Sequence, residues 1–173
     1  MLFNERFLKV FSDTCKEEYP KHKVKSIAEN LYTYYQEPSA YHVFPDFFPF
    51  ANGIQSQKLI AVSNFDNRLI NILKKLKISQ YMSDIITSEN ANSSKPNAKI
   101  FMRAVEHLKN IQPKHILHIG DDISKDYNGA RAMGWHALLM CRDGHSISET
   151  IPKDHICKDF HDVTNWLQKT RFE

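Results

Sequence analysis

The sequence predicts an α/β protein: a Rossmann-like parallel sheet with helices on both faces, plus a partial helical cap. Two observations carry this prediction. From about residue 44 onward, short apolar runs alternate with amphipathic stretches, a pattern typical of parallel strands that helices connect. Clusters of polar residues also follow some of the apolar runs directly, and ligands in such sheets bind at the carboxyl ends of the strands.

The N-terminal quarter of the chain shows no strand signal. Apolar residues recur there at helical spacing over residues 2–11. Ser26 is expected to cap a second helix that runs to about Tyr35, with Glu29 three residues after the cap. We therefore interpret residues 1–43 as a partial helical cap and residues 44–173 as an incomplete Rossmann-like core.

Each element of the core rests on a local pattern. An irregular helix is expected first, because Pro49 fits a first helical turn and Gly53 weakens the helix end. The strands are short apolar runs, and the helices carry apolar residues three and four positions apart. The predicted strands are 59–63, 84–87, 115–119, 137–140 and 155–156. The predicted helices are 47–57, 67–77, 98–109, 125–133 and 162–170.

Composition excludes several classes of protein. Hydrophobic residues make up 42% of the 173, as in globular domains. No apolar run approaches the roughly 20 residues of a membrane span, so no membrane partner is expected. The net charge of +3 is spread along the chain, and we expect no nucleic-acid partner. Three unpaired cysteines and the lack of a signal-peptide core predict a cytoplasmic location, with a nuclear one as the alternative.

Two motifs carry groups that can hold a phosphate. Ser63 and Asn64 follow the strand expected at 59–63, where a hydroxyl and backbone N–H groups can bind phosphate oxygens. Lys95 lies in a loop before a helix, where its ammonium group can neutralise a phosphoryl group. Either motif alone is common in proteins without such a function.

A third motif is acidic. Asp121 and Asp122 follow the strand expected at 115–119, and Asp126 lies in the next turn. Carboxylates at a strand end provide the hard oxygen ligands that Mg²⁺ prefers. A turn and a helix cap explain one or two of these residues but less easily all three. The order of the three motifs along successive strand ends is more specific than any single motif.

These motifs resemble those of the haloacid dehalogenase-like hydrolases, most closely the domain-containing protein 3 group of that family. The resemblance rests on SNFDNRL, TSENANSSKPNAKIF, HIGDDISKDYNGARAMGWH and IPKDHI. It implies a Mg²⁺-dependent, phosphatase-like site. Ser63 and Asn64 would bind the phosphoryl group, and Lys95 would steady both that group and the nucleophile. Asp121 would ligate Mg²⁺, and Asp126 would support the metal or Lys95.

One part of the family pattern is missing. The family's nucleophile and its general acid/base lie in an Asp-x-Asp motif on the first, central strand. Before Ser63 this chain has only Asp13 and Asp46, and neither has a second Asp two residues away. The segment KVFSDTC is a tempting alternative, but it would place Val10 at the nucleophile position and leave too few residues for a cap. Without a carboxylate nucleophile, no phospho-aspartyl intermediate can form.

The missing strand also affects folding. In the family it lies between the strand that ends at Ser63 and the strand that precedes Asp121, so its loss leaves two half-sheets with unpaired inner edges. We expect a shortened form or incomplete gene model of a complete hydrolase, a rearranged or gapped sheet, or a strand borrowed from a partner. The C-terminal motifs are intact, which favours the first.

Three functions follow from these expectations. The chain is an inactive, shortened phosphatase-like hydrolase, a non-catalytic module that binds phosphate, Mg²⁺ or a protein, or a scaffolding domain. The partners to expect are a small phosphorylated ligand, and a protein or a second copy at the unpaired edges.

Overall fold

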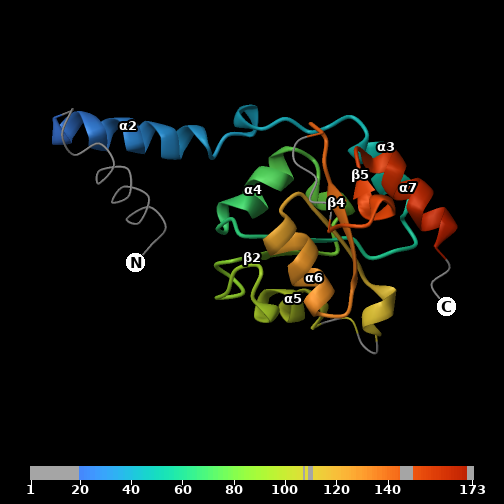
Figure 1. Cartoon of the computed structure of the whole chain (residues 1–173). Coiled ribbons are helices and arrows are strands. Elements are labelled where there is room, and N and C mark those ends of the chain that lie inside the picture. The colour runs from blue at the N-terminus through green and yellow to red at the C-terminus, as the bar shows by residue number, and fades with distance from the viewer. Residues whose placement is uncertain (1–19, 107, 109–110, 145–149, 171–173) are drawn as a thin grey trace.

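The computed structural model describes residues 20–170 except 107, 109–110 and 145–149 (Figure 1). It contains five short strands and helices of three kinds. The strands are β1 (Ile60–Ser63), β2 (Asp84–Thr87), β3 (Leu117–Gly120), β4 (His136–Met140) and β5 (Ile156–Cys157). The α-helices are α2 (Lys21–Tyr34), α3 (Phe47–Gly53), α4 (Arg68–Lys75), α5 (Ala98–Val105), α6 (Gly129–Ala132) and α7 (Phe160–Lys169). A π-helix, η4 (Ile123–Asn128), precedes α6, and four 3-10 helices are η1 (Pro38–Ala40), η2 (Ser79–Tyr81), η3 (Pro113–His115) and η5 (Lys153–His155).

The described strands form two parallel sheets, not one. β1 pairs with β2, and β4 lies between β3 and β5. In the described part of the chain, β1 and β3 are therefore edge strands that pair on one side only. This is the arrangement that the sequence predicts for a Rossmann-like sheet without its central strand.

Helices cover both faces of the larger sheet, as predicted. On one face, Phe101 of α5 and Ala130 of α6 pack with Ala137 and Leu139 of β4. On the other face, Leu138 of β4 packs with apolar residues of α3 and α7, and Figure 1 shows these two helices side by side. Leu138 faces opposite to its neighbours because successive strand side chains alternate between the two faces.

The two edge strands are less buried than the strand with neighbours on both sides. Ala137, Leu138 and Leu139 of β4 are each at most 3% exposed. In contrast, every residue of β1 and of β3 is only partly buried. Apolar strands in the middle of a fold are usually fully buried, so the partial exposure indicates open space beside them.

The strand predictions are confirmed to within two residues, but three helix predictions need correction. The helix expected at 47–57 ends at Gly53, because glycine weakens a helix. The helix expected to begin at Ser26 begins at Lys21 instead, because the carbonyl of the N-cap Pro20 accepts from the N–H groups of Lys23 and Val24. The helix expected at 125–133 is a π-helix followed by one short α-helix. The helix expected at 2–11 lies outside the described residues.

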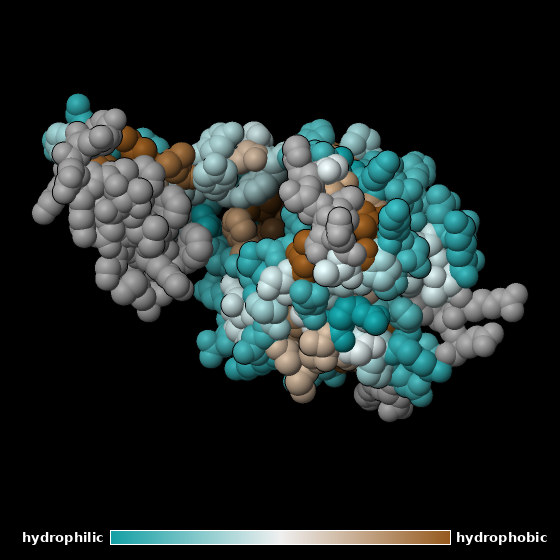
Figure 2. All heavy atoms as spheres, in the orientation of Figure 1, coloured by the Kyte–Doolittle hydropathy of each residue, from teal (hydrophilic) through white to brown (hydrophobic). Residues whose placement is uncertain are grey.

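The helix α2 projects away from the core in Figure 1. Its last turns approach the core through Tyr32, whose ring lies 4.2 Å from the guanidinium carbon of Arg68 in α4. In Figure 2, hydrophobic atoms form the floor of a hollow beneath the segment that joins α2 to α3.

No described helix is long and apolar enough to cross a membrane. Among the described residues, Cys141 and Cys157 form no disulfide bond, and Cys15 lies outside them.

Candidate functional site

The three predicted motifs meet at one pocket between the two sheets. Its walls come from the loops that follow β1 and β3 and from the loop before α5. The lining residues are Asn64, Lys95, Asp121, Asp122, Lys125 and Asp126. The carboxyl ends of parallel strands therefore form the site, as the fold class predicts.

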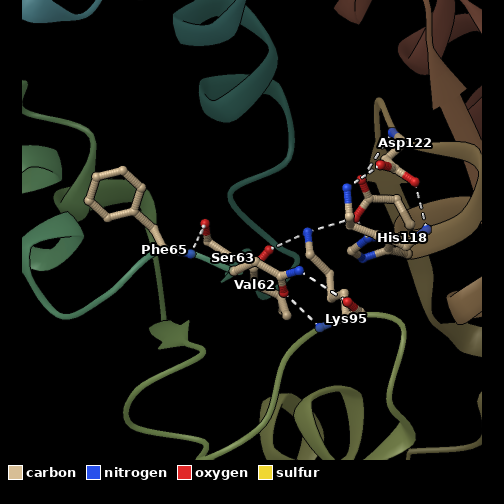
Figure 3. Close-up of polar contacts among 9 residues, drawn as sticks. Val62, Ser63, Phe65, Lys95, His118 and Asp122 are labelled. Carbon is tan, nitrogen blue, oxygen red and sulfur yellow. Dashed lines mark hydrogen bonds and ion pairs between the residues drawn. The ribbon is translucent and has the colours of Figure 1, made fainter. Parts of the chain in front are cut away.

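Lys95 links the two sheets across this pocket (Figure 3). Its Nζ donates to the carbonyl oxygen of Val62 in β1 at 2.9 Å and to Asp126 Oδ1 at 2.6 Å. The same Asp126 oxygen lies 3.0 Å from Nε2 of His118 in β3. These contacts form a continuous polar bridge from β1 to β3 with side chains at most 13% exposed. We call this set of contacts the Lys95 bridge.

The charge of Asp126 depends on its partners. Burial on its own would raise the pKa of this carboxyl group. Hydrogen bonds from His118 and Lys95, the positive charge of Lys95, and the backbone N–H of Asp122 outweigh that effect and hold the pKa well below its ordinary value. Asp126 is therefore an ionised carboxylate whose oxygens are both engaged, Oδ1 by the Lys95 bridge and Oδ2 by the Asp122 N–H at 3.1 Å.

Gly120 allows Asp126 to reach this position. A Cβ atom at residue 120 would lie 2.3 to 2.5 Å from Cγ, Cβ and Oδ2 of Asp126, closer than any real contact. The π-helix contributes as well, because the Asp122 carbonyl accepts from the N–H groups of both Asp126 and Tyr127. The sequence GDDISKD thus folds so that its last aspartate turns back over the end of β3.

Asn64 holds the Lys95 loop. Its Oδ1 accepts from the backbone N–H of Lys95 at 2.6 Å, and its Nδ2 donates to the Lys95 carbonyl at 3.0 Å. The Ser63 hydroxyl accepts from the Phe65 N–H at 3.1 Å and keeps a proton that it can donate to a ligand. The side chain of Asn64 therefore positions Lys95. Ser63 is not among the residues that line the pocket, and anion binding by Ser63 and Lys95 stays a prediction.

The remaining two carboxylates differ from each other. Asp122 caps η4 by accepting from the backbone N–H of Lys125, and it also accepts from Lys125 Nζ at 2.5 Å. These contacts with Lys125 lower the pKa of Asp122. Asp121 is exposed, and it is the one carboxylate of the pocket for which the described residues provide no hydrogen bond or ion pair.

The pocket offers Mg²⁺ few protein ligands. The ion takes six oxygen ligands in near-octahedral geometry and usually keeps several waters while it binds through one or two carboxylates. Asp126 and Asp122 both have cationic partners here, so Asp121 alone is available. Among the described residues, no group of three His, Cys, Asp or Glu side chains is placed to hold a metal. The predicted ligands Asp121 and Asp126 lie in one pocket, but Asp126 faces Lys95.

Sequence reasoning missed His118. Its side chain is 10% exposed, and its ring packs edge-on against Phe101 with the ring centroids 5.4 Å apart. A polar residue inside an apolar strand requires a buried partner, and this is the signal that could have identified His118.

Asp46 lies away from the pocket, where its Oδ2 accepts from Arg142 at 2.9 Å and the Phe160 N–H at 2.8 Å. Asp13 is outside the described residues.

Comparisons with known sequences identify the family of the chain. The family model of the haloacid dehalogenase-like hydrolases matches residues 4–140. Haloacid dehalogenase-like hydrolase domain-containing protein 3 of Bos taurus is 35% identical over 137 residues, which are 76% of this chain and 54% of that protein. The Rhythmically expressed gene 2 protein of Drosophila melanogaster is 36% identical over 112 residues, 61% of this chain and 43% of that protein. The chain thus spans about half the length of the curated relatives it matches.

Solved structures with the same fold complete the comparison. The HAD-hydrolase YfnB of Bacillus subtilis, solved bound to magnesium, superposes with a TM-score of 0.79 at 18% identity, covering 96% of this chain and 73% of that one. A HAD phosphatase of Thermococcus onnurineus gives a TM-score of 0.73 at 22% identity, covering 99% of this chain and 91% of that one. Because the family model matches most of this chain, the chain belongs to the haloacid dehalogenase-like hydrolases.

Proposed function

We propose that this chain carries the phosphate-binding part of a phosphatase-like hydrolase site and does not itself hydrolyse phosphate esters. The observation that carries the proposal is the Lys95 bridge. It holds a buried ammonium group at the strand ends, and the residues beside it supply anion-binding groups but no carboxylate placed as a nucleophile.

The anion-binding half of the proposal rests on Lys95 and Ser63. An ammonium group has three donors, and Lys95 uses two of them on Val62 and Asp126. The third donor and the Ser63 hydroxyl remain for a phosphoryl oxygen. Asn64 fixes the Lys95 backbone by two hydrogen bonds, so the group is held in place before a ligand arrives, which lowers the entropy cost of binding.

The absence of turnover rests on the carboxylates. In the family that the chain resembles, the nucleophile is a carboxylate, which has to lie within reach of the phosphorus atom. Asp126 is engaged at both oxygens and Asp122 is paired with Lys125. Asp121 is exposed and has no partner among the described residues that would orient it. Phosphoryl transfer depends on such positioning, so we expect binding without chemistry.

A first prediction tests both halves. The purified chain should turn over p-nitrophenyl phosphate with Mg²⁺ no faster than its Lys95→Ala variant. Calorimetry should detect inorganic phosphate binding with a dissociation constant on the order of millimolar. Ser63→Ala should weaken that binding by about tenfold, because one charge-assisted hydrogen bond is lost.

Lys99→Ala is the matched control, because Lys99 is an exposed lysine only four residues from Lys95. It should bind phosphate as the unmodified chain does. Turnover that Asp121→Asn abolishes would contradict the proposed inactivity. Lack of phosphate binding by a folded chain would contradict the proposed binding site.

A further inference from the structure

The space between β1 and β3 has the features of a site for an added strand. We propose that it binds an extended polypeptide segment of another chain, with about four apolar residues followed by an acidic one. Such a segment would join the two sheets into one by β-augmentation, in which main-chain hydrogen bonds supply the affinity. This inference concerns a protein partner. Its acidic residue would use the same Lys95 donor that the proposed function gives to phosphate, so the two ligands would compete.

The first argument is the state of the two strand edges. β1 pairs only with β2, and β3 pairs only with β4, in the part of the chain that the structure describes. Each edge therefore presents unpaired backbone donors and acceptors, which are a template for another strand. All four residues of β1 and all four of β3 are only partly buried, although both strands are largely apolar. An inserted strand would cover both.

The second argument is access. The site pocket opens at the carboxyl ends of the strands, between Asn64 and Lys95 on one side and Asp121 and Asp126 on the other. A second cleft lies at the N-terminal ends of β1 and β2, the two strands of the smaller sheet. Its lining includes Leu59 and Ser83, which directly precede these strands. Its lining also includes Ile54, which follows α3 and packs against the core cluster that contains Leu138 of β4 and Cys157 of β5.

One cleft thus lies at the carboxyl ends of β1 and β3, and the other lies at the start of β1 and β2. An extended segment of four residues spans about 13 Å, which matches the four residues of β1 and of β3. Both sheets are parallel throughout, so a parallel segment would present its carboxyl end to Lys95.

The third argument is the chemistry at that end. Lys95 Nζ donates to the Val62 carbonyl and to Asp126, and one of its three donors remains. A carboxylate at the end of the inserted segment is the strongest acceptor for that donor. The Val62 carbonyl has two lone pairs, so it can accept from the N–H of an inserted segment and keep its hydrogen bond with Lys95 Nζ. Lys95 therefore selects an acidic residue after the apolar ones.

The experiment uses the whole chain and a synthetic peptide. The probe is fluorescein-labelled Lys-Lys-Val-Ile-Val-Ile-Asp-Gly, in which the lysines provide solubility. We expect saturable binding by fluorescence anisotropy and a rise in hydrogen-exchange protection of both residues 60–63 and residues 117–120. Replacing the peptide's Asp with Leu should weaken binding by about tenfold, as should Lys95→Ala in the protein, because a charge-assisted hydrogen bond is lost.

Two controls make the result decisive. A peptide with proline in place of the first Ile cannot complete the hydrogen-bond ladder and should not bind. The Lys99→Ala variant should bind the original peptide unchanged. The peptide substitutions keep the test valid if Lys95→Ala fails to fold, because the protein is unaltered.

Three outcomes would overturn the proposal: no binding, protection confined to the outer edges at β2 or β5, or equal binding of the proline peptide. A dimer by light scattering in which residues 60–63 and 117–120 are already protected would also overturn it, because a second copy would then be the occupant.

Discussion

Gly120 sets how closely the Asp126 carboxylate can approach the end of β3. The Asp126 side chain occupies the place where any other residue at 120 would put its Cβ atom. Without that approach, Asp126 could not reach Lys95 and His118 together. At the scale of single residues, the Lys95 bridge therefore depends on a residue that has no polar side chain.

The Gly120→Ala substitution should displace Asp126 and lower the free energy of unfolding by about 1 to 3 kcal/mol, the usual cost of overpacking. Urea unfolding measures the change. Gly53→Ala is the matched control, since a Cβ at Gly53 meets no atom within 4 Å, and its effect should stay within about 1 kcal/mol of zero. Similar losses for both variants would show that the contact with Asp126 is unimportant.

Individual site residues differ in how far the sequence predicts them. Ser63 lies at the end of β1 and Lys95 in the loop before α5, as the sequence predicts, and the pocket is lined by Lys95 and by Asn64, the neighbour of Ser63. The amide of Asn64 binds the Lys95 backbone, a contact that the sequence does not predict, and phosphoryl binding by Asn64 stays a prediction. His118 was not predicted, since its partner is eight residues away and meets it only after the chain turns back through the π-helix.

Among the elements, α7 shows how a local signal and packing act together. Its N-cap Asp159 accepts from the N–H groups of His161 and Asp162, which satisfies two of the free donors of the first turn. Val163 is fully buried against the larger sheet. The cap therefore fixes where the helix starts, and the apolar face fixes where the helix lies.

Asp159→Ala should lower the free energy of unfolding by about 1 kcal/mol, the typical cost of losing an N-cap side chain. Asp159→Asn keeps an acceptor in the same place and should cost only a few tenths of that amount. Chemical denaturation of the two variants provides the comparison. If Asn is as costly as Ala, the negative charge and not the cap geometry accounts for the effect.

Strands were easier to predict than helices for a physical reason. Each strand is a short apolar run between polar residues, so its limits are visible in the sequence. The capping pattern at Ser26 suggested a start for α2, but the helix begins earlier, directly after Pro20. The π-helix forms where the Asp122 carbonyl accepts from two N–H groups. Neither feature has a periodic sequence signal.

For the molecule as a whole, the Lys95 bridge is a polar connection between the two sheets. It joins β1 to β3 through an ion pair whose carboxylate is 4% exposed. Because the pKa of Asp126 is lower in the folded chain than in the unfolded one, the ionised carboxylate stabilises the fold. That contribution is present above the unfolded pKa and is lost as the pH falls through the folded pKa.

Asp126→Asn should therefore lower the free energy of unfolding at pH 7 by about 3 kcal/mol, because Lys95 loses its buried partner. Below the ordinary Asp pKa of about 4, the difference between variant and unmodified chain should shrink. Urea unfolding at pH 7, 5, 4 and 3 measures both effects. Asp122→Asn breaks a more exposed pair and should cost less than about 1 kcal/mol at pH 7. A difference for Asp126→Asn that is constant across this pH range would contradict the assignment.

The sequence by itself determined the fold class, the strands, the family and the motif that is missing, because these depend on local patterns and on the order of residues along the chain. Only the tertiary structure decided how the site residues are used. In the folded chain, Asp126 binds Lys95, Asn64 holds the Lys95 loop, and β1 and β3 are separate, partly exposed edge strands. The physical reason is that partners for buried charges and strand edges come from distant parts of the chain, and their contacts exist only after the chain has folded.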